Sequence, residues 1–157
     1  MAETLGSLVD KLSIKNLRLW HLEEIIDGGD VSGSELDVLQ AKRDLVLGQR
    51  DELLREVDGF LAAAMEGKVK IRDEKVKLYN NPTASSAAGL ANLGQAVSEL
   101  AMRNIRLWHL EDEVRRTDLP DSEIVKLKRE IDKRNQERNN FMDQVDEILW
   151  NQSSRKK

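Results

Sequence analysis

The sequence predicts an all-α protein, a four-helix bundle made of two duplicated antiparallel helical hairpins. A segment of nine residues occurs twice, as NLRLWHLEE at 16–24 and as NIRLWHLED at 104–112. The similarity extends without a gap over 5–61 and 93–149, with about 20 identical pairs, so the repeat covers a structural unit. Charged residues make up 34% of the chain and there are only two prolines, a composition typical of long exposed helices.

The first helix is expected to begin near Leu5 and to end in the segment DGGDVSGS. Its apolar side chains form one stripe when each residue is turned by about 100°. Gly28 and Gly29 suit a helix C-terminal cap, and Ser32 with Glu35 predicts a capping box for the next helix. The residues of the stripe are Leu5, Leu8, Val9, Leu12, Leu19, Trp20 and Ile26.

The second helix of each half has the alternating three- and four-residue spacing of helices that pack side by side. In the second half the turn before it reads TDLPDSE, where Asp118 or Asp121 is expected to cap the helix and Pro120 to stop the preceding one. The spaced residues are Leu36, Leu39, Arg43, Val46, Arg50, Leu53, Val57 and Phe60, then Ile124, Leu127, Ile131, Arg134, Arg138, Phe141, Val145 and Ile148.

We expect one domain over 1–157, with hairpins at 4–65 and 92–152 joined by a linker at 66–91. The linker begins with KVKIRDEKVKLY at 68–79, whose alternation of polar and apolar residues permits a small β-hairpin. A linker of this length can return the second hairpin to the first or pass it to another chain. A monomeric bundle and a hairpin-swapped homodimer therefore both remain open.

Helical projection directs part of the repeated motif toward the predicted core. Trp20 and Trp108 lie at the edge of the inward stripe, which also contains a buried carboxylate in each half. Such a carboxylate needs a charged or hydrogen-bonding partner. We predict an inner polar layer that either fixes helix register or lines a pocket for an anionic or sugar-like ligand. The layer contains Asn16, Glu23, Arg43 and Arg50, with Asn104, Glu111, Arg134 and Arg138 as its counterpart.

The motif histidines fall on the opposite side of their helices, His21 beside Ile14 and Leu17, and His109 beside Met102 and Ile105. An arginine precedes each histidine by three residues, which opposes a bound cation, so no metal site is predicted. General acid–base chemistry with the following carboxylate is the alternative, because histidine titrates near neutrality. This stripe fits a packing face for the linker or a partner protein better.

Charge and composition narrow the classes of partner. The net charge is −4 with both signs interspersed, so nucleic acid is not an expected partner. The chain has no cysteine, and neither a signal sequence nor an apolar run long enough to span a membrane is apparent. No glycine-rich phosphate loop is present, and no cofactor is expected. These features favour a soluble cytoplasmic protein.

The second half resembles a bacterial family of uncharacterised helical proteins, known only as a domain of unknown function. The family pattern runs approximately N-x-x-L-W-H-x-E-D, then P-D, then K-R-x-I-D-x-x-N-Q-x-R-N. The first half fits less closely, since Gly48 replaces the glutamine and the K-R-x-I-D segment is absent. The matching residues are Asn104, Leu107, Trp108, His109, Glu111, Asp112, Pro120, Asp121, Lys128, Arg129, Ile131, Asp132, Asn135, Gln136, Arg138 and Asn139.

The resemblance implies proteins encoded near glycosyltransferases of surface-polysaccharide assembly. It favours a non-enzymatic binding or scaffold protein whose partner is a glycosyltransferase, with Asn135, Gln136, Arg138 and Asn139 facing Trp108 for sugar or partner recognition. Two alternatives remain. One is a small acid–base or metal-dependent enzyme that uses His109 with Glu111 or Asp112, and the other is a regulator or chaperone that only dimerises.

Overall fold

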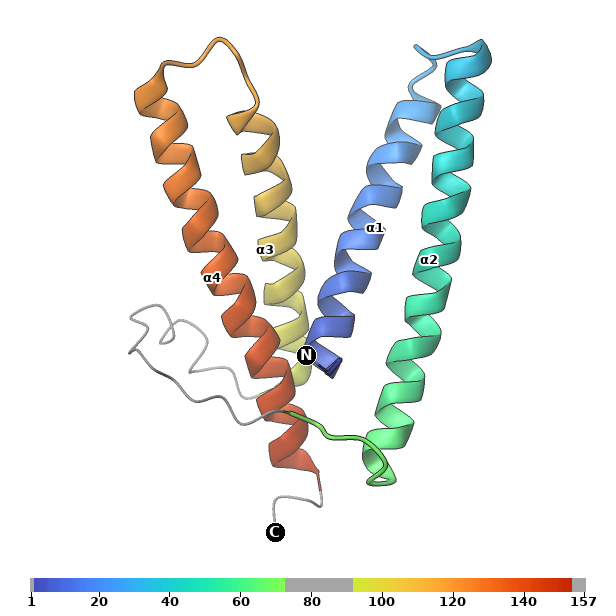
Figure 1. Ribbon diagram of the computed structural model, residues 1–157, viewed down its shortest axis with the longest axis vertical. Helices are drawn as coiled ribbons and strands as arrows, with labels where there is room; N and C mark the ends of the chain where they lie inside the picture. The colour runs from blue at the N-terminus through green and yellow to red at the C-terminus, as the bar shows by residue number, and fades with distance from the viewer. Residues whose placement is uncertain (1, 73–91, 154–157) are drawn as a thin grey trace.

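A computed structural model describes residues 2–72 and 92–153, and these ranges contain four α-helices and no strand (Figure 1). The prediction of an all-α protein is confirmed. Residues 68–72 of the predicted β-hairpin are not extended into a strand, and the remainder of it lies outside the described residues. The helices are α1 (Leu5–Asp27), α2 (Gly33–Met65), α3 (Leu93–Val114) and α4 (Asp121–Gln152).

Helix α2 packs along α1, and α4 packs along α3. One side-chain bond recurs at the same place in both pairs. Lys15 Nζ donates to Gln49 Oε1 at 2.6 Å, and Arg103 Nε donates to Glu137 Oε2 at 2.6 Å. Each residue of the second bond lies 88 positions after its counterpart in the first. The two helices of each pair therefore meet in the same register.

Local sequence explains how α1 and α3 begin. Thr4 and Ser7 form a capping box at α1, each side chain bonding to the backbone of the other residue. Asn92 accepts a hydrogen bond from the Gln95 amide at the start of α3. Past the end of α1, Gly29 takes a φ of 75°, the left-handed conformation that glycine tolerates. The chain can therefore leave α1 sharply, as predicted.

The caps predicted for α2 and α4 are wrong. Ser32 precedes α2 but makes no side-chain capping bond, so it forms no capping box with Glu35. The chain enters α2 through Gly33, whose φ of 63° lies in the left-handed region. At α4 the N-cap is Pro120 and not an aspartate: Asp121 is the first residue of the helix, and Asp118 accepts hydrogen bonds from Arg116.

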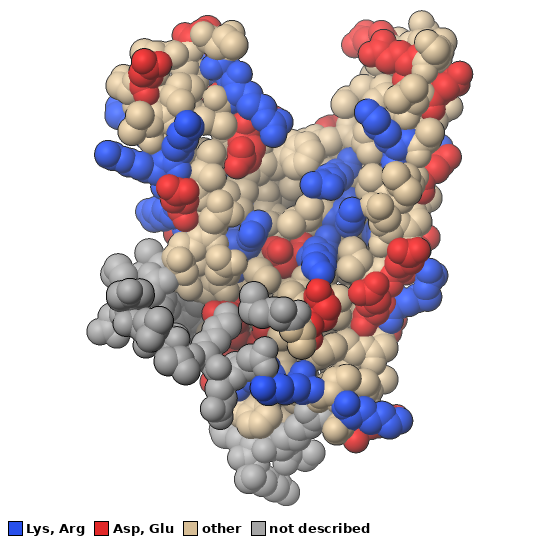
Figure 2. Space-filling model, in the orientation of Figure 1, with Lys and Arg blue, Asp and Glu red and all other residues tan. Residues whose placement is uncertain are grey.

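The two helix pairs meet at one end and diverge toward the other, which gives the molecule a V shape (Figures 1 and 2). Near its N-terminus α1 contacts both α3 and α4, whereas α2 packs against no described helix except α1. The helices therefore do not close into a bundle over their full length. The main buried cluster lies at the closed end and comprises Leu5, Ala64, Ile71, Ala96, Val145, Ile148 and Leu149.

A glycine permits the close approach of α1 to α4 at this closed end. The Gly6 amide donates to Asp146 Oδ1 at 2.7 Å. A Cβ atom at Gly6 would lie 2.3 Å from the carbonyl oxygen of Met142, a distance that no side chain can occupy. The first-turn amides of a helix have no partner within the helix, so the aspartate satisfies one of them in a buried place.

Candidate functional site

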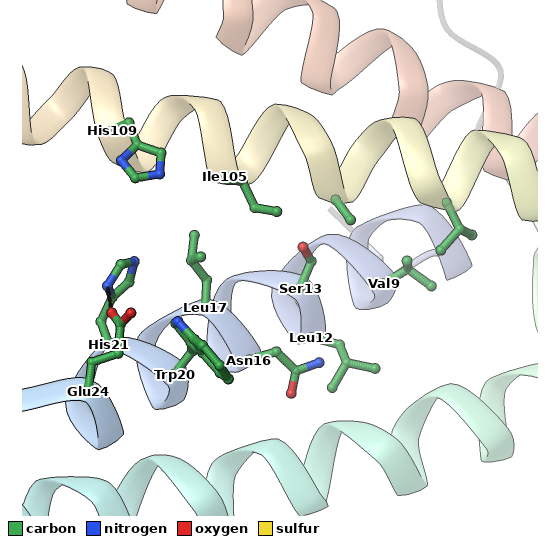
Figure 3. A pocket seen from close by; sticks show the side chains of 12 residues that line it. Val9, Leu12, Ser13, Asn16, Leu17, Trp20, His21, Glu24, Ile105 and His109 are labelled. Carbon is green, nitrogen blue, oxygen red and sulfur yellow. Dashed lines mark hydrogen bonds and ion pairs between the residues drawn. The ribbon is translucent and has the colours of Figure 1, made fainter. Parts of the chain in front are cut away.

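An open cavity of about 590 Å³ lies between α1 and α3, where the two helix pairs begin to separate (Figure 3). Most of its wall is apolar, and the histidines gather at one end of the view. Figure 2 shows the hollow between the two arms, with charged side chains of both signs on this face. The lining residues are Val9, Leu12, Ser13, Asn16, Leu17, Trp20, His21 and Glu24 of α1, and Val97, Ala101, Ile105 and His109 of α3.

The stripe that carries the motif histidines supplies much of this lining. Leu17 and His21 project from α1, and Ile105 and His109 project from the facing side of α3 (Figure 3). Each pair is spaced by four residues, so its members share one face of a helix. Helical projection distinguished this stripe from the core-facing one. It did not predict that the stripes of α1 and α3 would face each other.

A ring contact joins the two copies of the motif across the V. His21 stacks on Trp108 with ring centroids 4.5 Å apart and an interplanar angle of 9°. His21 Nδ1 also lies 3.0 Å from Glu24 Oε2, which fixes the orientation of the ring. The reciprocal pair is different, because Trp20 is 61% exposed and lies toward the α2 side of α1, away from His109 (Figure 3). The prediction that both tryptophans occupy equivalent inner positions is therefore wrong.

Of the predicted inner polar layer, the structure brings together only Asn104 and Arg138, both in the second half. Asn104 is buried and donates through Nδ2 to Asp10 Oδ1 at 2.9 Å. Arg138 Nε lies 3.8 Å from the same oxygen, so α1, α3 and α4 meet at one carboxylate. The sequence did not predict a role for Asp10, because helical projection places it on the stripe of Leu17 and His21 and not on the predicted inward stripe.

The other members of the predicted layer are in contact with water. Asn16, Glu23 and Glu111 are exposed, which contradicts their predicted inward orientation. Arg43 and Arg50 each bond to the aspartate that directly follows them in α2. The reason is the divergence of the helix pairs. Where no second pair covers the stripe, a charged or amide side chain keeps its hydration and avoids the free-energy cost of burial.

Glu137 is a buried acid that the sequence analysis did not select. Its Oε2 accepts hydrogen bonds from Arg103 Nε at 2.6 Å and from Arg134 Nη1 at 2.9 Å. Burial acts to raise the pKa of Glu137, but the hydrogen bonds from Arg134 and Arg103 outweigh it and lower that pKa below its ordinary value. Arg134 is thus half-buried and pairs with an acid, as predicted, but with an acid on its own helix.

The structure distributes the remaining candidates outside the cavity. Gln136 Nε2 donates to Asn140 Oδ1 at 3.2 Å, Asn135 is half-buried and Asn139 is exposed. Trp108, which the resemblance placed opposite these residues, stacks on His21 instead. Of the binding candidates, Asn16, Trp20, His21 and His109 line the cavity. Those that do not are Glu23, Arg50, Asn104, Trp108, Glu111, Asp112, Asn135, Gln136, Arg138 and Asn139.

Two further properties concern only residues 2–72 and 92–153. These residues bring together no group of three or more His, Asp or Glu side chains that could hold a metal ion. None of their helices combines the length and the apolarity needed to cross a membrane.

Four long helices and a cavity between two diverging helix pairs define a helical protein with an open interhelical cleft. The chain matches the model of the family described as Protein of unknown function (DUF4254) over residues 1–72 and 94–157. It therefore belongs to that family. No curated protein and no solved structure matches the chain.

Proposed function

We propose that this protein is a non-enzymatic binding protein that receives a partner in the cleft between α1 and α3. The observation that carries the proposal is the open cavity of about 590 Å³ with largely apolar walls. Folded proteins rarely leave such a surface uncovered unless it binds something. Polar groups at the wide end, His21, Glu24 and His109, would orient the bound segment.

The resemblance noted in the sequence supplies the class of partner. We propose a cytoplasmic glycosyltransferase of bacterial surface-polysaccharide assembly, for which the protein acts as a scaffold. An apolar cleft suits a protein segment better than a free sugar, because sugar hydroxyls need many hydrogen-bonding groups and the apolar wall offers few.

Affinity purification from the native cell tests this proposal. The wild-type chain should retain a glycosyltransferase encoded nearby, and Ile105→Asp should lose it, because the substitution places a charge on the apolar wall. Val125→Asp is the matched control, since Val125 is a similarly exposed aliphatic residue of α4 outside the cleft. Retention of the partner by Ile105→Asp would exclude the cleft as the binding site. Absence of any glycosyltransferase from the wild-type eluate would exclude this class of partner.

One observation favours a second function, acid–base catalysis. His21 Nδ1 lies 3.0 Å from Glu24 Oε2 and both side chains line the cavity, the arrangement of a histidine held by a carboxylate. Glu24→Gln separates the two functions. A catalytic site requires that this variant keeps the partner but fails to restore surface polysaccharide in a deletion strain. Full restoration would exclude catalysis by this pair, so that binding would be the one remaining function.

We further propose that the two helix pairs are copies of one hairpin unit. The recurring bonds, Lys15 with Gln49 and Arg103 with Glu137, support this, because both ends of the bond keep the same offset. Equivalent positions in the two pairs can then be compared directly.

A further inference from the structure

The contact between α1 and α4 has an unoccupied counterpart elsewhere in the chain. In the occupied contact, Gly6 of α1 accommodates the backbone of Met142 and donates its amide to Asp146. Leu149, one turn further along α4, is 7% exposed and joins the core cluster with Leu5. The packing contact between the two helices is thus formed by a glycine, an aspartate and flanking aliphatic side chains.

The equivalent residues 88 positions away in the sequence do not form this contact with each other. Gly94 occupies the place of Gly6 in the first turn of α3, and no described atom lies within 4 Å of a Cβ built on it. On α2, Leu54, Asp58 and Leu61 stand for Met142, Asp146 and Leu149. Leu54 and Leu61 are 44% and 41% exposed, and Asp58 is exposed as well. The two surfaces that would form a second contact are therefore both present, but they do not touch each other within the chain.

The exposed residues of α2 form a continuous stripe that its own hairpin does not use. Leu53, Val57 and Ala64 face the interior on the α1 side. Leu54, Asp58, Leu61 and Met65 follow at steps of four, three and four residues, which places them together on a neighbouring face. Three large aliphatic side chains at helix-packing spacing indicate a face that receives another helix.

We propose that this stripe of α2 docks on the first turn of α3 in a second copy of the chain. Gly94 then admits the backbone at Leu54 of the other copy, and Asp58 of that copy accepts the Gly94 amide. Each chain carries one stripe and one such turn, so a two-fold axis satisfies both contacts at once. The result is a closed homodimer with no docking face left over.

A second copy is the better occupant because α1 intervenes within a single chain. Helix α1 contacts α2 on one side and α3 and α4 on the other, and α2 packs on neither α3 nor α4 (Figure 1). For α2 to reach Gly94 of its own chain, α1 would have to leave the core cluster that contains Leu5. Docking between copies needs no such displacement.

Sedimentation over a range of protein concentrations tests the dimer. The wild-type chain should dimerise, and Gly94→Leu should raise the dimer dissociation constant by at least about tenfold, because a side chain there separates the two backbones. Gly48→Leu is the matched control, since Gly48 also lies in open space on a helix but off the stripe. A wild-type monomer at every concentration, or equal dissociation constants for the two variants, would overturn the proposal.

Chemical cross-linking identifies which faces of the two copies meet. The chain has no native cysteine, so only the introduced thiols react. The occupied contact brings Arg138 Nε within 3.8 Å of Asp10, and the counterparts of these two residues are Arg50 and Ser98. Mixing an Arg50→Cys chain with a Ser98→Cys chain of different mass should yield a mixed dimer with a short thiol-specific reagent. Either variant alone should not. In the double variant, a cross-link confined within the monomer would overturn the proposal in favour of closure within one chain.

Discussion

Single side chains decide how closely the helices approach at the closed end of the V. Gly6 lets α1 lie against the backbone of α4, and Asp146 satisfies the amide that this approach buries. Glu137 performs a similar role between α3 and α4, where it neutralises two arginines. At both places a buried group is satisfied by a polar partner, so removing that partner leaves the buried group without compensation.

Replacing Gly6 by alanine should destabilise the protein by about 1–3 kcal/mol, the usual cost of forcing atoms into a packed site. The new Cβ would meet a backbone carbonyl that cannot rotate away. Gly48→Ala should instead stabilise by about 0.5–1 kcal/mol, because alanine favours the helix and meets nothing there. Urea unfolding of both variants measures the difference, and equal effects would contradict the close approach.

Glu137 should make stability depend on pH. Its pKa is lowered in the folded state, so its contribution is present above the unfolded pKa and is lost as the pH falls through the folded value. Glu137→Gln should cost about 1–3 kcal/mol at neutral pH, and the difference from wild type should shrink below about pH 4.5.

Glu99→Gln is the control for this acid, since Glu99 pairs with the same Arg103 at 3.4 Å but is more exposed. We expect a cost within about 1 kcal/mol for that surface pair. Chemical denaturation between pH 3 and pH 7 gives both curves; a Glu137→Gln difference that stays constant over this range would refute the pH dependence.

At the level of residues, the sequence predicted some buried polar groups and missed others for a definable reason. Projection on one helix identified Asn104, which is buried, and Arg134, which is half-buried against Glu137. It also placed Asn16 and Glu23 inward, because projection gives a direction around the helix and not what stands opposite. Whether a polar residue is buried depends on a second helix pair, whose position only tertiary packing sets.

Among the helices, α2 and α4 are nearly equal in length but differ in how much they bury. Helix α4 buries seven residues from Ile131 to Leu149, and α2 buries only Leu53 and Ala64. The cause is their neighbours, since α4 packs on both α3 and α1, whereas α1 is the one described helix on which α2 packs. Helix propensity alone gives little stability, so the burial of each helix should set its resistance to local opening.

Hydrogen exchange should therefore distinguish the two helices. Amides in the first half of α2, residues 33–50, should exchange at least about tenfold faster than those of 137–149 in α4, because fewer apolar contacts oppose their opening. Exchange should be measured at a concentration low enough to keep the chain monomeric. Equal protection of the two segments would mean that α2 is covered in solution.

The sequence predicted helix type and approximate position well, because a periodic stripe over many residues is a strong local signal. Helix ends were less certain, as Ser32 and Pro120 show, since a cap depends on the φ and ψ of one or two residues. The divergence of the pairs was not predicted. Side-chain periodicity defines which face packs, whereas the crossing angle follows from the detailed fit of both surfaces.

For the molecule as a whole, the open arms of the V are held by few contacts. Away from the closed end, stacking of the His21 ring on Trp108 joins one helix pair to the other. A stacked ring pair of this kind contributes about 0.5–1.5 kcal/mol beyond its buried area. That is enough to favour one separation of the arms and too little to prevent a partner from changing it.

Removal of this ring should loosen the arms. Spin labels on Asp30→Cys and Thr117→Cys, which lie in the two turns at the open end, report the separation without interference from native thiols. We expect His21→Ala to broaden the measured distance distribution, while Trp20→Ala, which removes the exposed ring beside it, leaves it unchanged. An identical distribution in His21→Ala would show that other contacts set the separation.

The bond between Gly6 and Asp146 joins residues 140 positions apart in the chain. During synthesis on a ribosome, α1 therefore emerges long before its partner on α4 exists. The first helix pair can form from local contacts as soon as it is made, but the junction must wait until α4 has been synthesised. Folding should accordingly occur in two stages, with a nascent chain that exposes the α4-facing side of α1 until α4 emerges.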